Sequence, residues 1–140
     1  METSKFNWEI VEEIAKTVFP DEYEMATPKQ VKEIEKRISE GQSPFVQRQT
    51  AGGMPMDFGA AINVVANIMV ITNIIVTWYI STRPKEQELS YDNFRNSINQ
   101  DNALNTLFVN FLSQEAIHLL ERYFDQIIEA LSEIIKALND

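Results

Sequence analysis

Only a few residues of this chain have a type and spacing that could support chemistry. The single histidine, His118, follows Glu115 by three residues, and residues three apart share one face of a helix. This Glu-x-x-His spacing occurs in di-iron helical bundles, which need the motif twice together with further carboxylates. One histidine cannot supply two copies, so we expect His118 to be a solvated surface residue and expect no metal site.

Nucleophilic catalysis and phosphate binding are supported just as weakly. Ser113 precedes His118 by five residues on one expected helix, so the two side chains point in different directions. The absence of cysteine from the sequence excludes disulfide bonds, thiolate catalysis and cysteine zinc sites. Gly52 and Gly53 lack both the lysine of a phosphate-binding loop and the fingerprint of a dinucleotide site. We therefore expect no catalytic residues, no cofactor and no enzymatic activity.

Pairs of acidic residues are the remaining candidates for acid–base chemistry. Glu12 and Glu13 are adjacent, and Glu33 and Glu35 are two residues apart, each pair within a stretch rich in charged residues. Such pairs are typical of a solvated acidic surface, because isolated carboxylates are rarely buried. We expect both pairs to be exposed and find no acid–base constellation among them.

Length and charge restrict the class of protein. The 140 residues fit one domain, and 21 acidic against 12 basic residues give a net charge of −9. Neither half of the chain is basic, so binding to nucleic acid through phosphate neutralisation is disfavoured. The N-terminal residues lack the continuous apolar run of a secretory signal. We expect a cytoplasmic protein whose partners are other proteins or further copies of itself, with no nucleic acid.

Amphipathic segments must position these residues, and most of them read as helices. Apolar residues three and four apart predict helices at 7–19, 28–40 and 89–100. Thr27, Pro28 and Gln30 form a capping-box pattern at the start of the second helix. A longer helical region spans 103–138, where the apolar positions repeat as a heptad: Ile117, Leu120, Phe124, Ile127, Leu131, Ile134 and Leu138. A face this broad is typical of a bundle of several helices.

The segment 58–81 dominates the sequence because it carries no charged residue. A helix through it collects small and polar residues on one side, which permits close helix packing: Gly59, Asn63, Asn67, Asn73 and Thr77. We favour a central buried helix of a compact bundle. A membrane span is the alternative, because about 20 apolar residues suffice to cross a bilayer. A pair of strands is a third possibility, disfavoured by the lack of turn residues near Thr72.

These patterns predict an all-α single domain of five or six helices around the central helix at about 58–80. We expect a non-enzymatic protein–protein interaction or adaptor module that acts through helical surfaces or self-association. Its alternative is a small single-pass membrane protein or membrane-perturbing effector that uses residues 58–80. Two surfaces are candidates for partner contacts, the apolar loop 42–57 and one flank of the last helix, and their residues are Phe45, Val46, Met54, Met56, Tyr123, Ile128 and Ile135.

Overall fold

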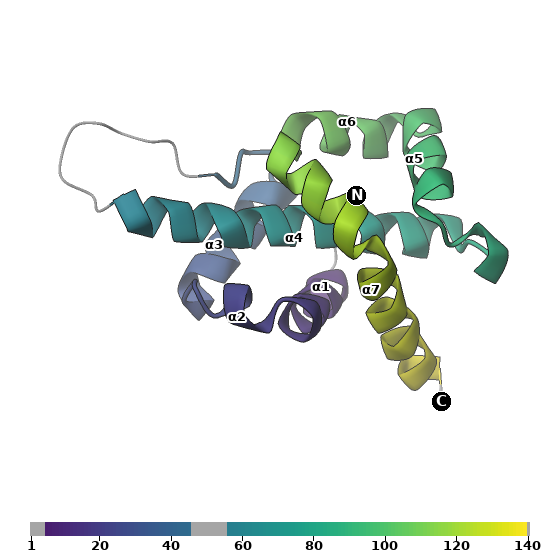
Figure 1. Cartoon of the computed structure of the whole chain (residues 1–140), viewed down its shortest axis with the longest axis horizontal. Helices are drawn as coiled ribbons and strands as arrows, with labels where there is room; N and C mark the ends of the chain where they lie inside the picture. Colours follow the sequence, from purple (N-terminus) through teal and green to yellow (C-terminus); the bar gives the residue numbers. More distant parts are fainter. Residues whose placement is uncertain (1–4, 46–55, 140) are drawn as a thin grey trace.

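The computed structural model describes residues 5–45 and 56–139, with side chains described at 7–45, 61–106 and 112–138. These residues form seven α-helices and one 3-10 turn without any strand, so the all-α prediction is confirmed (Figure 1). The elements are α1 (Lys5–Val18), α2 (Pro20–Tyr23), α3 (Pro28–Ser39), α4 (Met56–Thr82), the turn η1 (Glu86–Glu88), α5 (Tyr91–Gln100), α6 (Asn102–Phe111) and α7 (Gln114–Asn139). The helices outnumber the expected five or six because α2 is a separate single turn and the region 103–138 forms two helices.

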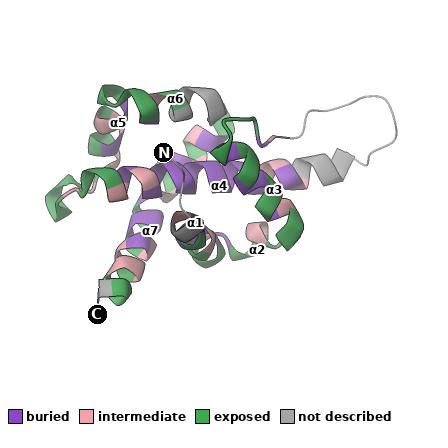
Figure 2. Cartoon of the chain, turned by 180° about the vertical axis from the view of Figure 1, so that it is seen from behind, coloured by how far each residue is buried: buried purple, intermediate pink, exposed green. Residues whose placement is uncertain are grey.

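Helix α4 is the central element, as expected for residues 58–80. It contacts each of the other six α-helices in the described part of the chain. Helices α1 and α2 lie on one side of it, α5 and α6 lie on the other, and α3 and α7 cross it (Figure 1). Every residue from Val65 to Val76 is buried (Figure 2). A helix that is apolar all round is stable in water only when neighbours cover it on every side, and these helices supply that cover.

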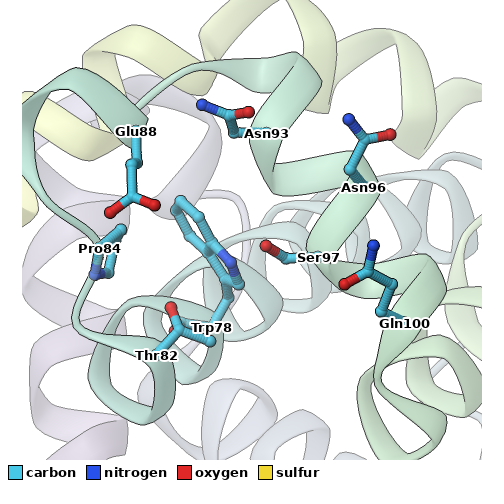
Figure 3. A pocket seen from close by; sticks show the side chains of 8 residues that line it. All are labelled: Trp78, Thr82, Pro84, Glu88, Asn93, Asn96, Ser97 and Gln100. Carbon is cyan, nitrogen blue, oxygen red and sulfur yellow. The ribbon is translucent and has the colours of Figure 1, made fainter.

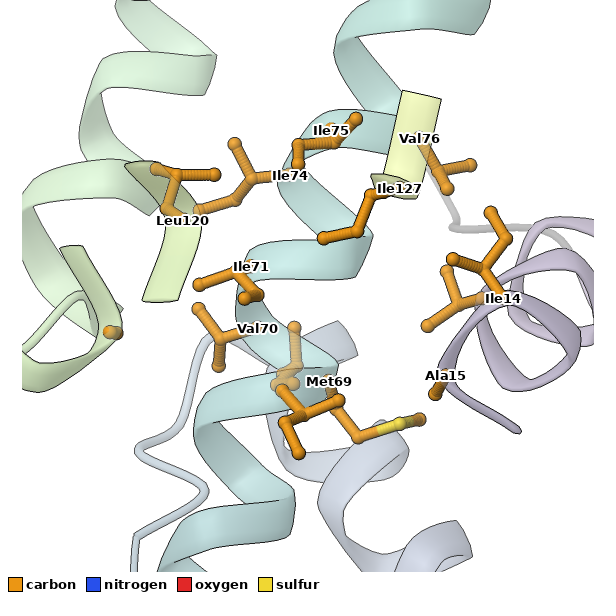
Figure 4. Packing of buried hydrophobic residues seen from close by; sticks show 14 of the residues in the cluster. Ile14, Ala15, Met69, Val70, Ile71, Ile74, Ile75, Val76, Leu120 and Ile127 are labelled. Carbon is orange, nitrogen blue, oxygen red and sulfur yellow. The ribbon is translucent and has the colours of Figure 1, made fainter. Parts of the chain in front are cut away.

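The core is built where α1 and α7 meet α4. Ile14 and Ala15 of α1 face α4 from one side, and Leu120 and Ile127 of α7 approach it from another (Figure 4). All four residues are fully buried. Burying one isoleucine or leucine side chain stabilises the fold by about 1.5–3 kcal/mol relative to leaving it exposed. The amphipathic helices therefore fold onto α4 to cover their own apolar stripes.

Local signals fix where several helices begin and end. The capping box of α3 is confirmed: the Gln30 amide donates to Thr27 Oγ1 at 3.2 Å, and the Thr27 amide donates to Gln30 Oε1 at 2.8 Å. Gly41 follows α3 with a φ of +74°, a conformation that glycine adopts without a steric penalty. Ser113 separates α6 from α7, because its Oγ accepts the amide hydrogen of Ala116 at 3.1 Å. The end of α1 agrees with the sequence pattern within one residue.

An aromatic cluster joins α4 to α5 and α7. Trp78 stacks edge-on against Phe94 at 5.2 Å between ring centroids and lies 6.2 Å from Phe124. Phe94 and Phe124 are themselves 5.2 Å apart. Aromatic pairs at such distances contribute about 0.5–1.5 kcal/mol beyond their buried area. This cluster anchors the C-terminal end of α4.

One helix within the described residues, Ala61–Thr82, is long and apolar enough to cross a membrane. The fold buries 78% of its most apolar stretch. Length and composition alone are equally typical of a span and of a core helix.

Candidate functional site: a groove beside a buried carboxyl pair

A groove opens where α1, the α2 turn and the start of α3 meet. It has a volume of about 470 Å³ and a mostly apolar lining. Met25 lies in it with 48% of its surface exposed, although most large apolar side chains of the described residues are covered. Charged side chains of α1 and α3 form its rim. The lining residues are Glu12, Lys16, Tyr23, Glu24, Met25, Ala26, Thr27, Pro28, Val31 and Lys32.

Two carboxyl groups meet beside this groove, Glu12 from α1 and Glu35 from α3. Lys32 joins them, with its Nζ 2.7 Å from Glu12 Oε2 and 3.5 Å from Glu35 Oε1. The Glu35 side chain is only 8% exposed, and its Oε2 is buried without a hydrogen-bond partner among the described residues. A buried carboxylate oxygen without a donor is unfavourable, because it loses its hydration without replacement.

Protonation of Glu35 resolves this problem. Burial, together with the hydrogen bond and negative charge of Glu12, raises the pKa of Glu35 to about 8. Burial also acts to raise the pKa of Glu12, but hydrogen bonds from Glu35 and Lys32 outweigh it and the pKa of Glu12 is lowered. The two groups therefore share one proton at neutral pH, with Glu35 as the acid and Glu12 as the carboxylate, as closely spaced carboxyls do.

Two further side chains surround the pair at the groove. The Tyr23 hydroxyl donates to Glu12 Oε1 at 3.4 Å, and the Lys16 ammonium lies 5.7 Å from the centre of the Tyr23 ring. Burial, with the negative charge of Glu12, raises the pKa of Tyr23 to about 12, so its phenol stays neutral. The hydrogen bond to Glu12 raises the pKa of Lys32, which stays protonated. Chemically, the arrangement can hold and release one proton and can present a fixed ammonium group at the groove.

The expectation that Glu33 and Glu35 form a solvated pair is wrong for Glu35. Glu33 is exposed and pairs with Arg37 one turn later at 3.3 Å. Glu35 lies four residues after buried Val31 and one after buried Ile34, so it occupies the apolar stripe of α3. The sequence could have shown this burial through the spacing of Glu35 from Val31 and Ile34. A carboxyl group on a buried stripe is rare unless it is paired.

The expected loop surface lies mostly outside the described residues. Val46 and Met54 are outside them, and Met56 is the first residue of α4, with its side chain outside the described part. Phe45 is half-buried and packs against the core. Partner binding through this loop stays a prediction.

The C-terminal helix presents less apolar surface than expected. Ile128 is 7% exposed and belongs to the core, so its placement on an exposed flank is wrong. Ile128 lies beside Ile127 and Leu131 on the broad apolar face of α7, which is buried in the core. Tyr123 is half-buried and lies edge-on to Phe19 at 4.9 Å. Ile135 is half-buried against the core edge, and Leu138 is 57% exposed at the end of α7.

The small and polar stripe of α4 is mostly turned toward other helices. Asn67 and Asn73 are buried, and Asn63 and Thr77 are half-buried, while the burial of Gly59 lies outside the described residues. The Ser113 hydroxyl donates to Asn67 Oδ1 at 3.2 Å, which ties α4 to the start of α7.

The described residues contain no group of three or more His, Cys, Asp or Glu side chains placed to hold a metal ion. His118 is exposed on α7. No protein-family model matches this chain, and no curated protein or solved structure is significantly similar to it.

Proposed function

We propose that this chain is a non-enzymatic interaction module that binds a basic, helical segment of a partner protein in the groove between α1, α2 and α3. The observation that carries the proposal is the groove itself, a mostly apolar space of about 470 Å³ next to groups with perturbed pKa values. Binding sites favour such concave, largely apolar places with a few polar groups in fixed positions.

The exposed side of Met25 supports an apolar anchor on the partner. Methionine adapts its shape to irregular contacts and is enriched in interfaces that bind helices. The volume of about 470 Å³ suits one large apolar side chain of the partner, placed against Met25. The carboxyl pair and Lys32 hold α3 against α1 and thereby keep the groove open.

The charge around the groove supports a basic partner. The groove lining carries two acidic residues, Glu12 and Glu24, and two basic residues, Lys16 and Lys32. The surrounding stretch 7–26, which supplies most of the lining, contains six acidic residues and one basic residue. Opposite charges on a partner steer its approach and fix its orientation. An acidic partner would be repelled by the acidic residues around the groove and by the net charge of −9.

The test uses short helical peptides made of leucine and lysine, with a matched set of leucine and glutamate. Fluorescence anisotropy should show binding of the lysine peptide only. Met25→Gln removes the apolar contact without adding charge and should weaken binding about 5- to 10-fold, because about 1 kcal/mol of apolar burial is lost. Leu138→Gln, at the exposed end of α7, is the matched control and should leave binding unchanged. Equal binding of both peptides, or no effect of Met25→Gln, would contradict the proposal.

The membrane alternative retains one supporting observation, the length and apolarity of Ala61–Thr82. In that state the helices packed against α4 would have to separate from it. Size-exclusion chromatography with light scattering separates the two proposals and also reports self-association. The interaction module should elute as a monodisperse species without detergent, whereas the membrane protein should be recovered only with detergent.

A further inference from the structure

The two tryptophans of this chain satisfy their indole N–H groups very differently. Trp8 Nε1 donates to Ser39 Oγ at 2.9 Å. Trp78 is 1% exposed, and its Nε1 is buried without a hydrogen-bond partner among the described residues. Buried N–H groups are nearly always paired, and an unpaired one costs about 1–3 kcal/mol. An acceptor is therefore missing from the surroundings of Trp78.

A small pocket lies at this position, between the C-terminal end of α4 and helix α5. Its volume is about 170 Å³. Figure 3 shows the indole nitrogen on the edge of the ring that faces Ser97 and Gln100. Apart from Trp78 and Pro84, all lining side chains carry hydroxyl, amide or carboxylate groups: Thr82, Glu88, Asn93, Asn96, Ser97 and Gln100.

The charge of the pocket restricts what it can bind. No lining residue is basic, and Glu88 is acidic. The C-terminal end of α4 adds the partial negative charge of its free carbonyl groups. Anionic ligands are therefore disfavoured. A cation is disfavoured next to Trp78 for a different reason. The indole N–H needs a hydrogen-bond acceptor, and an ammonium group offers none.

The polar lining fits a ligand whose groups both donate and accept hydrogen bonds. Three side-chain amides and the Ser97 hydroxyl supply donors and acceptors together. The Thr82 hydroxyl already donates to the Trp78 carbonyl oxygen at 2.7 Å, and Glu88 Oε1 already accepts from the Lys85 amide at 2.8 Å. Hydroxyl groups of a ligand have the same dual character, and one of them could accept from Trp78 Nε1 while it bonds to Ser97. The volume of about 170 Å³ is below the range of about 300–1,000 Å³ for drug-sized ligands, so the ligand must be small.

We propose that this pocket binds a small neutral polyol, of monosaccharide size or less, through a hydrogen bond from the Trp78 indole N–H. The site lies on α4 and α5, apart from the groove formed by α1, α2 and α3. It stands independently of the proposed partner binding.

The indole proton signals in a two-dimensional ¹H–¹⁵N NMR spectrum test this proposal on the full chain. The Trp8→Phe variant retains a single indole signal, which assigns that signal to Trp78. In the unaltered chain, the signal of Trp8 serves as an internal reference for shifts unrelated to the pocket. Titration with glycerol or glucose should shift the Trp78 signal saturably and leave the Trp8 signal in place. Acetate and methylammonium are the anionic and cationic controls and should have no saturable effect.

Variants of exposed pocket residues test the same site without disturbing the core. Gln100→Ala should weaken polyol binding about 3- to 10-fold, the usual effect of one lost hydrogen bond. Gln126→Ala, an exposed glutamine on α7, should not. The proposal is wrong if neither polyol shifts the Trp78 signal saturably, which would leave water as its acceptor. Saturable binding of acetate or methylammonium alone, or an equal shift of both indole signals, would also overturn it.

Discussion

Replacement of Glu35 by glutamine tests the shared proton at the carboxyl pair. Glutamine has nearly the shape of a protonated glutamate but cannot ionise. If Glu35 is protonated in the folded protein, Glu35→Gln should preserve the fold at neutral pH. It should also remove a pH dependence of stability that the unaltered chain shows, because only the unaltered chain must release or retain that proton.

The direction and size of this pH dependence follow from the pKa of Glu35, about 8 in the folded chain against the ordinary 4.5. Between these values the folded state holds a proton that the unfolded state has lost. The stabilising effect of protonation is thus complete below about pH 4.5 and is lost as the pH rises through about 8. At about 1.36 kcal/mol per pKa unit, the loss over the three pH units between pH 5 and 8 is at most about 4 kcal/mol. The lowered pKa of Glu12 acts in the opposite direction and reduces this figure.

Urea unfolding followed by circular dichroism at several pH values between 5 and 8 measures this effect. The free energy of unfolding of the unaltered chain should fall with rising pH relative to Glu35→Gln. Glu33→Gln is the matched control, because Glu33 lies on the same helix but is exposed, and it should follow the unaltered chain. Parallel profiles for the unaltered chain and Glu35→Gln, or a relative gain in stability with pH, would refute the reasoning. Glu35 would then be ionised, with its ion pair to Lys32 outweighing its burial.

Two further pairs of substitutions, each a test variant with its control, probe the packing of α4. Ser113→Ala removes both the cap of α7 and the hydrogen bond to buried Asn67, so it should lower the free energy of unfolding by about 2–3 kcal/mol. Ser90→Ala removes only the cap of α5 and should lower it by about 1 kcal/mol; equal effects would contradict the double role of Ser113. Ile75→Ala should destabilise by about 2–5 kcal/mol because Ile75 is fully buried, whereas Leu138→Ala should change stability by less than about 0.5 kcal/mol, and thermal unfolding compares the two.

Local signals in the sequence were sufficient for the helical class and for part of the helix boundaries. The capping box at Thr27 needs only residues within one turn, so its pattern can be read without tertiary information. The apolar run from Phe58 to Ile80 likewise predicts a long helix by composition. The break at Ser113 departs from the single helical region expected over 103–138, and only the contact with Asn67 shows the two roles of that serine.

The candidate sites could not be predicted in the same way, because their residues come from separate helices. Glu12 and Glu35 are 23 positions apart, and their meeting depends on how α1 and α3 pack together. The pocket at Trp78 depends on the turn after α4, where Arg83 adopts a φ of +47° that is rare for a residue other than glycine. Neither the pairing of the helices nor this turn has a local pattern that identifies it.

The placement of α4 follows from the other helices as much as from its own composition. Transfer of α4 into a membrane would leave the apolar stripes of α1 and α7 without cover, including Ile14, Leu120 and Ile127, all fully buried in the fold. Each exposed side chain would forfeit about 1.5–3 kcal/mol unless a membrane or another protein covered it. Trp78, whose position near the end of the apolar run is also typical of a membrane interface, packs instead against Phe94 and Phe124. The amphipathic stripes therefore favour the folded bundle over a span, because only the bundle buries α4 and its covering helices together.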